Sequence, residues 1–293
     1  MFILVDEKHS QSAVHSSSTA APAPGKKTGN KKAEMAIYVV VAAAIIVVIL
    51  YFTLGRSSGS SSLYGTNVSV QNMQQLYSIA NNNTLANMVG VSAYGGVNGS
   101  SYFKVINATP LSNTSKPEID YVGGEFCPYC AADRWALILA FMRFGNFTGL
   151  KYMASSSTDS FPNTHTFSFL NSSYSSKYII FKGYEIANRT GGALMQINGT
   201  ISNTYSTYAS GIPFVDFNGG MVTSGSLANP EILSGMNWDQ IIAQLSQPNS
   251  TISGEEVGMA NIYTAKICQM INNASNVCSQ SYVKAAQQQF FAS

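Results

Sequence analysis

Charged side chains are scarce in this chain of 293 residues. Aspartate, glutamate, lysine and arginine together make up 10% of the sequence, where about 25% is usual. The formal net charge is only +2, so the chain lacks the basic excess typical of proteins that bind nucleic acids. With few carboxylates, little folding energy is lost when they take up protons. We therefore expect no nucleic-acid partner, and a fold whose stability changes little between neutral and strongly acidic pH.

The segment from Met35 to Leu54 contains no charged residue at all. A helix of about 20 residues extends about 30 Å, which matches the hydrocarbon core of a bilayer. Tyr38 lies near one end and Tyr51 and Phe52 near the other, as expected of aromatic side chains at the headgroups. A buried helix of a soluble protein would be expected to show a polar face, and this segment shows none. The pattern predicts one transmembrane helix at 35–54, in contact with membrane lipid.

The charges that flank this segment predict its orientation. Four lysines lie within the ten residues before it, and only Arg56 follows it closely. Positive residues favour the inner side, so we expect a single-pass protein of the cell membrane with a cytoplasmic N-terminus and residues 57–293 outside the cell. A cleaved signal peptide is the alternative, but residues 1–34 are too long for its first region and the apolar run is too long for its core. The lysines are Lys26, Lys27, Lys31 and Lys32.

Asn-x-Ser/Thr sequons, the acceptors of N-glycosylation, occur only beyond the predicted span. A chain rich in asparagine and serine produces some of these by chance, but their one-sided distribution agrees with an outward-facing domain. We expect a glycoprotein with sugars at several of these sites. The candidates are Asn67, Asn82, Asn98, Asn107, Asn113, Asn146, Asn171, Asn188, Asn198, Asn249 and Asn273.

Cysteine is also rare, and its four residues all lie beyond the span. Disulfides persist outside the cell, and the local pairing joins Cys127 to Cys130 and Cys268 to Cys278. We expect the second pair to be a structural disulfide on a helical extension, with a second redox relay as the alternative. A zinc site would require all four thiols to converge, and there is no second CxxC. No metal is expected.

The segment Cys127-Pro128-Tyr129-Cys130 follows an apolar stretch at 119–122 and precedes a helical pattern at 131–144. This order predicts a strand, a turn and a helix whose first turn holds both cysteines. Unpaired backbone N–H groups and the positive end of the helix dipole favour a thiolate there. A structural disulfide or half of a zinc site is the alternative to a reactive dithiol.

A second informative segment is Gly211-Ile212-Pro213, which opens an apolar run. A proline there is explained if the Ile212–Pro213 bond is cis, and an ordinary trans turn proline is the alternative. Asn218-Gly219 then predicts a hairpin. We also expect strands at 150–154 and 178–181, no helix in the polar stretch 155–210, and one helix over 230–245.

This order of elements resembles the thioredoxin-like superfamily over residues 116–245. The CxxC segment is similar to the active sites of thioredoxins, glutaredoxins and DsbA-type proteins, and its Pro-Tyr pair is similar to that of glutaredoxins. Gly211-Ile212-Pro213 resembles their cis-proline loop. Over residues 65–290 the chain also resembles an uncharacterised archaeal family, domain-of-unknown-function family 929, whose members look like membrane-anchored thioredoxin-like proteins. The segments that carry this second resemblance are Lys116-Pro117, Gly124 to Ala132, Arg134 to Leu137 and Arg143 to Gly145.

The resemblance implies an α/β, thioredoxin-like fold with an insertion before the cis-proline loop, on a single N-terminal transmembrane helix. Many thioredoxins have a buried acidic residue in the strand before the dithiol helix. This chain has no clear counterpart of that residue, unless Asp120 takes its place. The expected organisation is a disordered tail at 1–34, the span at 35–54, a tether at 55–66, a flanking segment at 67–115, the thioredoxin-like domain at 116–248 with its insertion at about 155–210, and a helical extension at 249–293.

Four charged or titratable residues near the motif are assigned no catalytic role. Glu125 could raise the pKa of a nearby thiol, but we expect a solvated turn residue. Asp133 and Arg134 are expected to cap the helix or to pair with neighbours. His165 is the only histidine beyond the span, and a lone histidine is usually structural.

The implied activity is thiol–disulfide exchange on exported proteins without a cofactor. Cys127 would be the nucleophile and Cys130 the resolving cysteine, while Pro128, Tyr129, Ile212 and Pro213 would contact the substrate. The partners would be the thiols and disulfides of exported proteins, with a quinone-linked membrane protein as electron partner. The alternative is a glycosylated envelope protein that binds or supports others on a thioredoxin scaffold with a static disulfide.

Overall fold

The computed structural model describes residues 63–97 and 99–292. The predicted tail, the transmembrane helix at 35–54, the first part of the tether and Asn98 lie outside the described residues. Across the described ranges, no helix is both long and apolar enough to cross a membrane.

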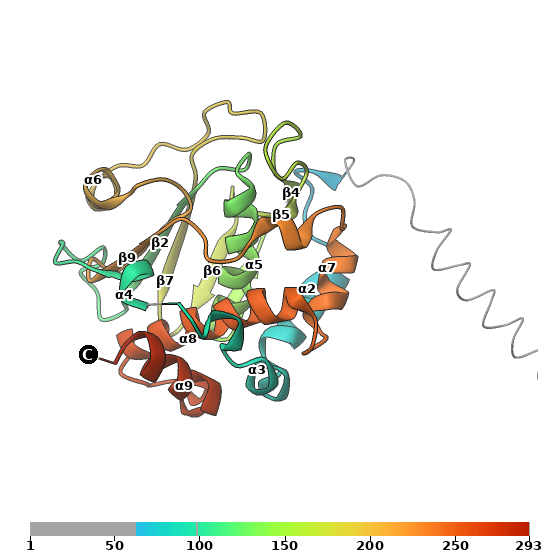
Figure 1. The fold of residues 1–293 in the computed structure, drawn as a ribbon. Coiled ribbons are helices and arrows are strands. Elements are labelled where there is room, and N and C mark those ends of the chain that lie inside the picture. Colours follow the sequence, from blue (N-terminus) through green and yellow to red (C-terminus); the bar gives the residue numbers. More distant parts are fainter. Residues whose placement is uncertain (1–62, 98, 293) are drawn as a thin grey trace, which may run out of the picture. The chain divides into compact units, whose positions relative to one another are not determined.

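A mixed five-stranded sheet forms the centre of the fold (Figure 1), in the order β1-β9-β8-β2-β7. The central strand β2 pairs in parallel with β7 on one side and antiparallel with β8 on the other. Strand β9 continues the sheet beyond β8, and β1 forms its far edge. The strands are β1 (Lys104–Val105), β2 (Glu118–Gly123), β7 (Ile180–Glu185), β8 (Phe214–Phe217) and β9 (Met221–Ser224). The fold is therefore α/β with a mixed sheet, as the sequence predicted at this level.

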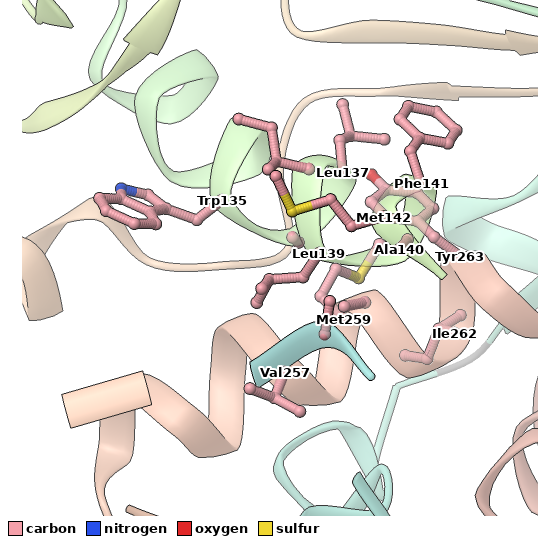
Figure 2. Close-up of a cluster of buried hydrophobic side chains, with 14 of the residues drawn as sticks. Trp135, Leu137, Leu139, Ala140, Phe141, Met142, Val257, Met259, Ile262 and Tyr263 are labelled. Carbon is pink, nitrogen blue, oxygen red and sulfur yellow. The ribbon is translucent and has the colours of Figure 1, made fainter. Parts of the chain in front are cut away.

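Helix α5 (Pro128–Met142) follows β2 directly and is the most deeply buried helix of the fold. All of its residues except Tyr129 are buried, because most of its sequence is apolar on every side. It packs against α8 (Gly258–Met270), and Figure 2 shows Leu139 and Ala140 next to Met259. Helix α5 is thus held by a large apolar core.

Two small sheets and one further helix lie between α5 and β8 in the sequence. Strand β3 pairs with β6, and β4 pairs with β5, all antiparallel. The expectation of no helix in 155–210 is wrong, since α6 (Thr200–Tyr208) forms there. Its residues are mostly serine, threonine, asparagine and tyrosine, which are weak helix formers, so packing of its buried Ile201 and Thr204 stabilises it. The strands are β3 (Gly145–Thr148), β4 (Lys151–Ala154), β5 (His165–Ser168) and β6 (Ser173–Ser176).

The hairpin predicted at Asn218-Gly219 is confirmed and connects β8 to β9. Both turn residues have positive φ, 54° for Asn218 and 74° for Gly219, as this turn type requires. A side chain on Gly219 would also collide with the backbone of Ala108 and Thr109. Asp216 accepts a hydrogen bond from the Gly219 N–H at 2.7 Å, which further fixes the turn.

The single helix expected over 230–245 is interrupted. A short 3-10 turn, η3 (Pro230–Leu233), is followed by α7 (Trp238–Leu245). Gly235 lies between them with φ at 74°, outside the helical region, and Asn237 begins α7 with a capping box. The apolar spacing predicted the helical faces correctly but not the break at Gly235.

Helices from both ends of the described chain complete the core. Helix α9 packs against α8, and α2 packs against α5 and α7. A disulfide joins Cys268 of α8 to Cys278 in the following turn, with Cα atoms 5.5 Å apart. The remaining elements are α2 (Val70–Ala80), α3 (Asn83–Val89), η2 (Ser92–Tyr94), α4 (Gly99–Tyr102), η4 (Ser253–Val257), η5 (Asn276–Ser279) and α9 (Ser281–Phe290).

Candidate functional site: a dithiol at a helix start

Cys127 and Cys130 lie at the beginning of α5 as two free thiols. Cys127 is the N-cap residue, and its Sγ accepts a hydrogen bond from the backbone N–H of Cys130 at 3.2 Å. The two cysteines come within 3.1 Å of each other. Cys127 is 6% exposed and Cys130 is fully buried. The pair is therefore close enough to form a disulfide, and only its first member reaches the surface.

The loop before β8 faces this pair. The Ile212–Pro213 peptide bond is cis, and the Ile212 carbonyl oxygen lies 4.0 Å from Cys127 Sγ. The contact joins residues that are 85 positions apart. It exists because β8 pairs with β2, which places Phe214 opposite Val122. Hence the two segments singled out in the sequence meet at one place.

Of the other residues expected at the site, Tyr129 is the one that solvent reaches most. Pro128 is the first residue of α5, where its fixed φ is compatible with helix entry. The Tyr129 side chain is 44% exposed, and its ring contacts that of Phe161 edge to face. The roles of Pro128, Tyr129, Ile212 and Pro213 toward a substrate stay predictions.

The two thiols differ in acidity. A hydrogen bond from the Cys130 side chain lowers the pKa of Cys127 below the usual value, and backbone N–H groups and the Arg134 cation act in the same direction against burial. Burial raises the pKa of Cys130 well above the usual value, and its hydrogen bond to Cys127 adds to this. Cys127 is therefore the thiol that ionises first.

Arg134 lies one helical turn after Cys130 and is completely buried. Its Nε and Nη2 donate to Oε1 and Oε2 of Glu185 at 2.9 and 2.6 Å, and Nη2 also donates to the Gly124 carbonyl at 2.9 Å. Of the two roles expected for Arg134, capping the helix or pairing with a neighbour, the structure has the pairing. An arginine within an otherwise apolar helical stretch is a signal that a buried partner exists, although it does not say which.

Glu125 is buried, so the expectation of a solvated turn residue is wrong. Its side chain is 4% exposed, and Oε1 accepts a hydrogen bond from Ser168 Oγ at 2.6 Å. Burial raises the pKa of this carboxyl above its usual value. The cause is β5, which packs over the start of α5 and covers the segment before Cys127. Nothing in the local sequence indicates this cover.

Asp120 does not occupy the place of a buried acid beside the dithiol. The charged groups around it are Glu118, Lys182 and Asp216, and no cysteine is among them. Since successive residues of a strand face opposite sides, it is the next residue, Tyr121, that faces α5. Burial, with the nearby Glu118, raises the pKa of Asp120 to about 8.

His165 is packed as an aromatic core residue. It is 9% exposed, and its ring centroid lies 4.4 Å from that of Trp238. Among the residues that the structure describes, no group of three or more histidine, cysteine, aspartate and glutamate side chains is placed to hold a metal ion. Because Cys268 and Cys278 are joined to each other, they are not ligands of a shared site with Cys127.

A polar pocket of about 320 Å³ lies next to the segment that precedes Cys127. It borders Phe126, the residue before Cys127, and its only cationic side chain is Arg189. Four of its eight lining residues are serine or threonine, which gives the pocket a largely hydroxyl-bearing wall. The lining residues are Phe126, Ser156, Thr158, Asp159, Ser160, Arg189, Thr190 and Gly191.

All but one of the sequon asparagines in the described ranges are exposed. Asn188 is the exception, because it is half-buried and its Oδ1 accepts hydrogen bonds from the N–H groups of Thr190 and Gly192. Glycosylation at the exposed sites stays a prediction.

The comparisons with known proteins identify one family over part of the chain. Residues 101–204 match the family described as Domain of unknown function (DUF929). The matched span contains β2, the dithiol and Arg134, and it ends before Ile212. Neither the curated proteins nor the solved structures include a match. The family therefore supplies no activity for this site.

Proposed function

We propose that this protein is a membrane-anchored thiol–disulfide oxidoreductase that faces outward and acts on exported proteins. The observation that carries the proposal is the close pair of free thiols at the start of α5, in which the more acidic thiol, Cys127, is the one that solvent still reaches, with 6% of it exposed. A structural cysteine pair needs no such difference in acidity. A lowered thiol pKa in a partly accessible position is typical of reactive cysteines.

The order of the elements supports a thioredoxin-like fold for the domain. In that fold the dithiol helix follows a central strand, a parallel strand lies on one side, and a cis-proline begins the antiparallel strand on the other side. Here α5 follows β2, β7 is the parallel neighbour, and Pro213 immediately precedes β8. The small sheets between α5 and β7, together with α6, would form the insertion.

The proposed reaction begins with the Cys127 thiolate. It attacks one sulfur of a substrate disulfide, a mixed disulfide forms, and the second substrate sulfur leaves as a thiolate. Cys130 then attacks Cys127 Sγ and releases the substrate as a reduced dithiol. In the oxidising direction the same steps run in reverse, and electrons pass from the protein to a membrane partner of quinone-linked type.

The backbone beside Cys127 is suited to holding an extended substrate segment. The Ile212 carbonyl faces the sulfur, and a peptide that pairs with this loop would place its own sulfur near Cys127. The membrane span at 35–54 would hold the domain near proteins that emerge from the cell. Few interactions with side chains would be needed, which suits an enzyme with many substrates.

Replacement of the resolving cysteine tests the proposal. In the full-length Cys130→Ala variant, Cys127 should form mixed disulfides with exported proteins that persist on non-reducing gels. The matched control is the double variant Cys127→Ala/Cys130→Ala, which should form none. The reduction potential of the wild-type pair should lie above about −300 mV, whereas a structural disulfide lies lower. If no adducts accumulate and the reduction potential lies below about −300 mV, the pair forms a structural disulfide in an envelope protein and the proposed function is wrong.

A further inference from the structure

Two buried hydrogen-bond donors without partners belong to residues that interact electrostatically with Cys130. The hydroxyl of Tyr121 and Nη1 of Arg134 have no hydrogen-bond partner in the structure. Both side chains are completely buried. Buried hydrogen-bond donors almost always have an acceptor. Two neighbouring donors without one therefore indicate an acceptor that forms during function.

Strand β2 places the Tyr121 hydroxyl at Gly123, four residues before Cys127. Tyr121 faces α5 from the centre of β2, and the Arg134 guanidinium lies over its ring at 5.6 Å from the centroid. Its hydroxyl reaches along the strand toward the motif, since a Cβ on Gly123 would collide with it. Gly123 therefore leaves the space that this hydroxyl occupies, just before the segment that carries the cysteines.

Arg134 is placed by its helix and by Glu185. Cys130 and Arg134 are four residues apart on α5, so they share one face. The ion pair with Glu185 and the bond to Gly124 use Nε and Nη2, which leaves Nη1 free for another acceptor. The charge of Arg134 acts on Cys130, and the Cys130 and Tyr121 side chains also interact electrostatically.

We propose that Tyr121 and Arg134 form a donor pair that stabilises the Cys130 thiolate while Cys130 resolves the mixed disulfide. This inference rests on the proposed function for the step in which it acts. The Cys130 thiol loses its proton, and its thiolate attacks Cys127 Sγ. The Cys127–Cys130 bond forms as the bond from Cys127 to the substrate breaks, and the departing substrate thiolate takes up the proton. Tyr121 and Arg134 keep their own protons throughout.

The donor pair explains how a deeply buried thiol can react. Burial alone opposes ionisation of Cys130. Burial also holds the pKa of Tyr121 well above its usual value, so this hydroxyl remains a donor at any pH at which the protein works. Tyr205 of α6 also lies within electrostatic range of Cys130, but it is only half-buried, so water can satisfy its hydroxyl.

The ionisation of Cys130 can be measured without the exchange reaction. In a Cys127→Ala background, Cys130 is the only free thiol, and its titration is followed by NMR of isotope-labelled cysteine Cβ. Adding Tyr121→Phe should raise the pKa of Cys130 by about one unit, a tenfold lower thiolate fraction at a given pH. The control is Tyr94→Phe, a buried tyrosine whose hydroxyl donates to the Glu255 carbonyl, and it should leave the titration unchanged.

A second measurement follows the resolving step in proteins that retain both cysteines. A coloured aromatic thiol is attached to Cys127 as a mixed disulfide, and its release by Cys130 is timed in a single turnover. Tyr121→Phe should slow the release about tenfold, and Arg134→Lys, which keeps the charge but loses the free Nη1, should slow it as well.

The outcomes separate this inference from the proposed function. An unchanged Cys130 titration in the Tyr121→Phe variant, or an equal shift in Tyr94→Phe, overturns the donor pair. If the wild-type pair proves to be a static disulfide, the proposed function fails while the titration still decides whether Tyr121 stabilises the Cys130 thiolate. If Arg134→Lys does not fold, the Tyr121→Phe comparison decides alone.

Discussion

Arg134 and Glu185 form a completely buried ion pair with two parallel hydrogen bonds, at 2.9 Å and 2.6 Å. The pair joins the dithiol helix to β7, the strand next to β2. Glu185 Oε1 also accepts the N–H of Phe169, so one carboxylate connects three segments behind the cysteines. Its geometry matches the planar fork that makes arginine–carboxylate pairs strong.

Removal of this carboxylate should strongly destabilise the fold. Glu185→Gln leaves the Arg134 cation buried without a counter-charge, which typically costs about 3–5 kcal/mol of unfolding free energy. Urea unfolding of the variant would measure it. The matched control is Lys182→Gln, which breaks the pair of Lys182 with Glu118 at 2.7 Å, where Lys182 is 51% exposed, and should cost about 1 kcal/mol or less. Equal losses in the two variants would contradict this account.

Cys127 should react with alkylating reagents at lower pH than an ordinary cysteine. Its pKa is held below the usual value by hydrogen bonds and by Arg134, so a larger thiolate fraction is present near neutral pH. Peptide mapping after a short treatment with iodoacetamide at about pH 7 should find the label on Cys127, with Cys130 unmodified. Equal labelling of both cysteines would contradict the assignment of Cys127 as nucleophile.

Stability should increase as the pH falls from about 8 to about 5. Burial raises the pKa of Asp120 to about 8, of Asp133 to about 7 and of Asp216 to about 6, whereas an unfolded aspartate has a pKa near 3.9. The folded state therefore holds protons that the unfolded state has already lost. This contribution is fully present below about pH 4 and is lost as the pH rises through the folded values.

Chemical unfolding across this pH range would measure the slope, and each unit of pKa difference corresponds to about 1.4 kcal/mol. The Asp120→Asn variant should show a flatter profile, because it removes the group with the highest of the three values. A loss of stability on acidification within this range would contradict the prediction. From the scarcity of charge we expected a stability that changes little with pH. The buried carboxyls instead predict a stability that increases as the pH falls.

The disulfide between Cys268 and Cys278 should contribute stability without taking part in exchange. Closing a loop of about ten residues stabilises by roughly 2–3 kcal/mol in the chain-entropy account, and both cysteines are buried. The double variant Cys268→Ala/Cys278→Ala should therefore unfold at lower denaturant concentration, and when it is combined with Cys130→Ala its Cys127 adducts should form at the same rate as in Cys130→Ala alone. A loss of exchange in a folded variant would instead support the alternative of a second redox relay.

Local signals predicted the features that depend on a few neighbouring residues. Asn218-Gly219 indicated the hairpin, because few residues tolerate positive φ. The cis bond at Pro213 followed from a proline at the start of an apolar strand. The spacing of Cys268 and Cys278 indicated their disulfide, which the structure contains.

The features that the sequence did not predict depend on distant partners. Glu185 is 51 residues from Arg134, and no periodicity connects them. The burial of Glu125 depends on β5, which lies beyond α5, β3 and β4 in the sequence. The orphan hydroxyl of Tyr121 could be recognised only with the positions of all its neighbours, since an apolar strand with a tyrosine is ordinary by itself.

The antiparallel pairing of β2 with β8 has a consequence for any shortened form of this protein. The span shared with the known family ends at Thr204, before β8 begins. A fragment that stopped there would keep both thiols but expose the hydrogen-bonding edge of β2. Such an exposed edge can pair with a second copy of the fragment and cause aggregation. The segment that matches the family and the segment that forms the central sheet are therefore different stretches of this chain, and only the longer one contains both the dithiol and the Ile212–Pro213 loop that faces it.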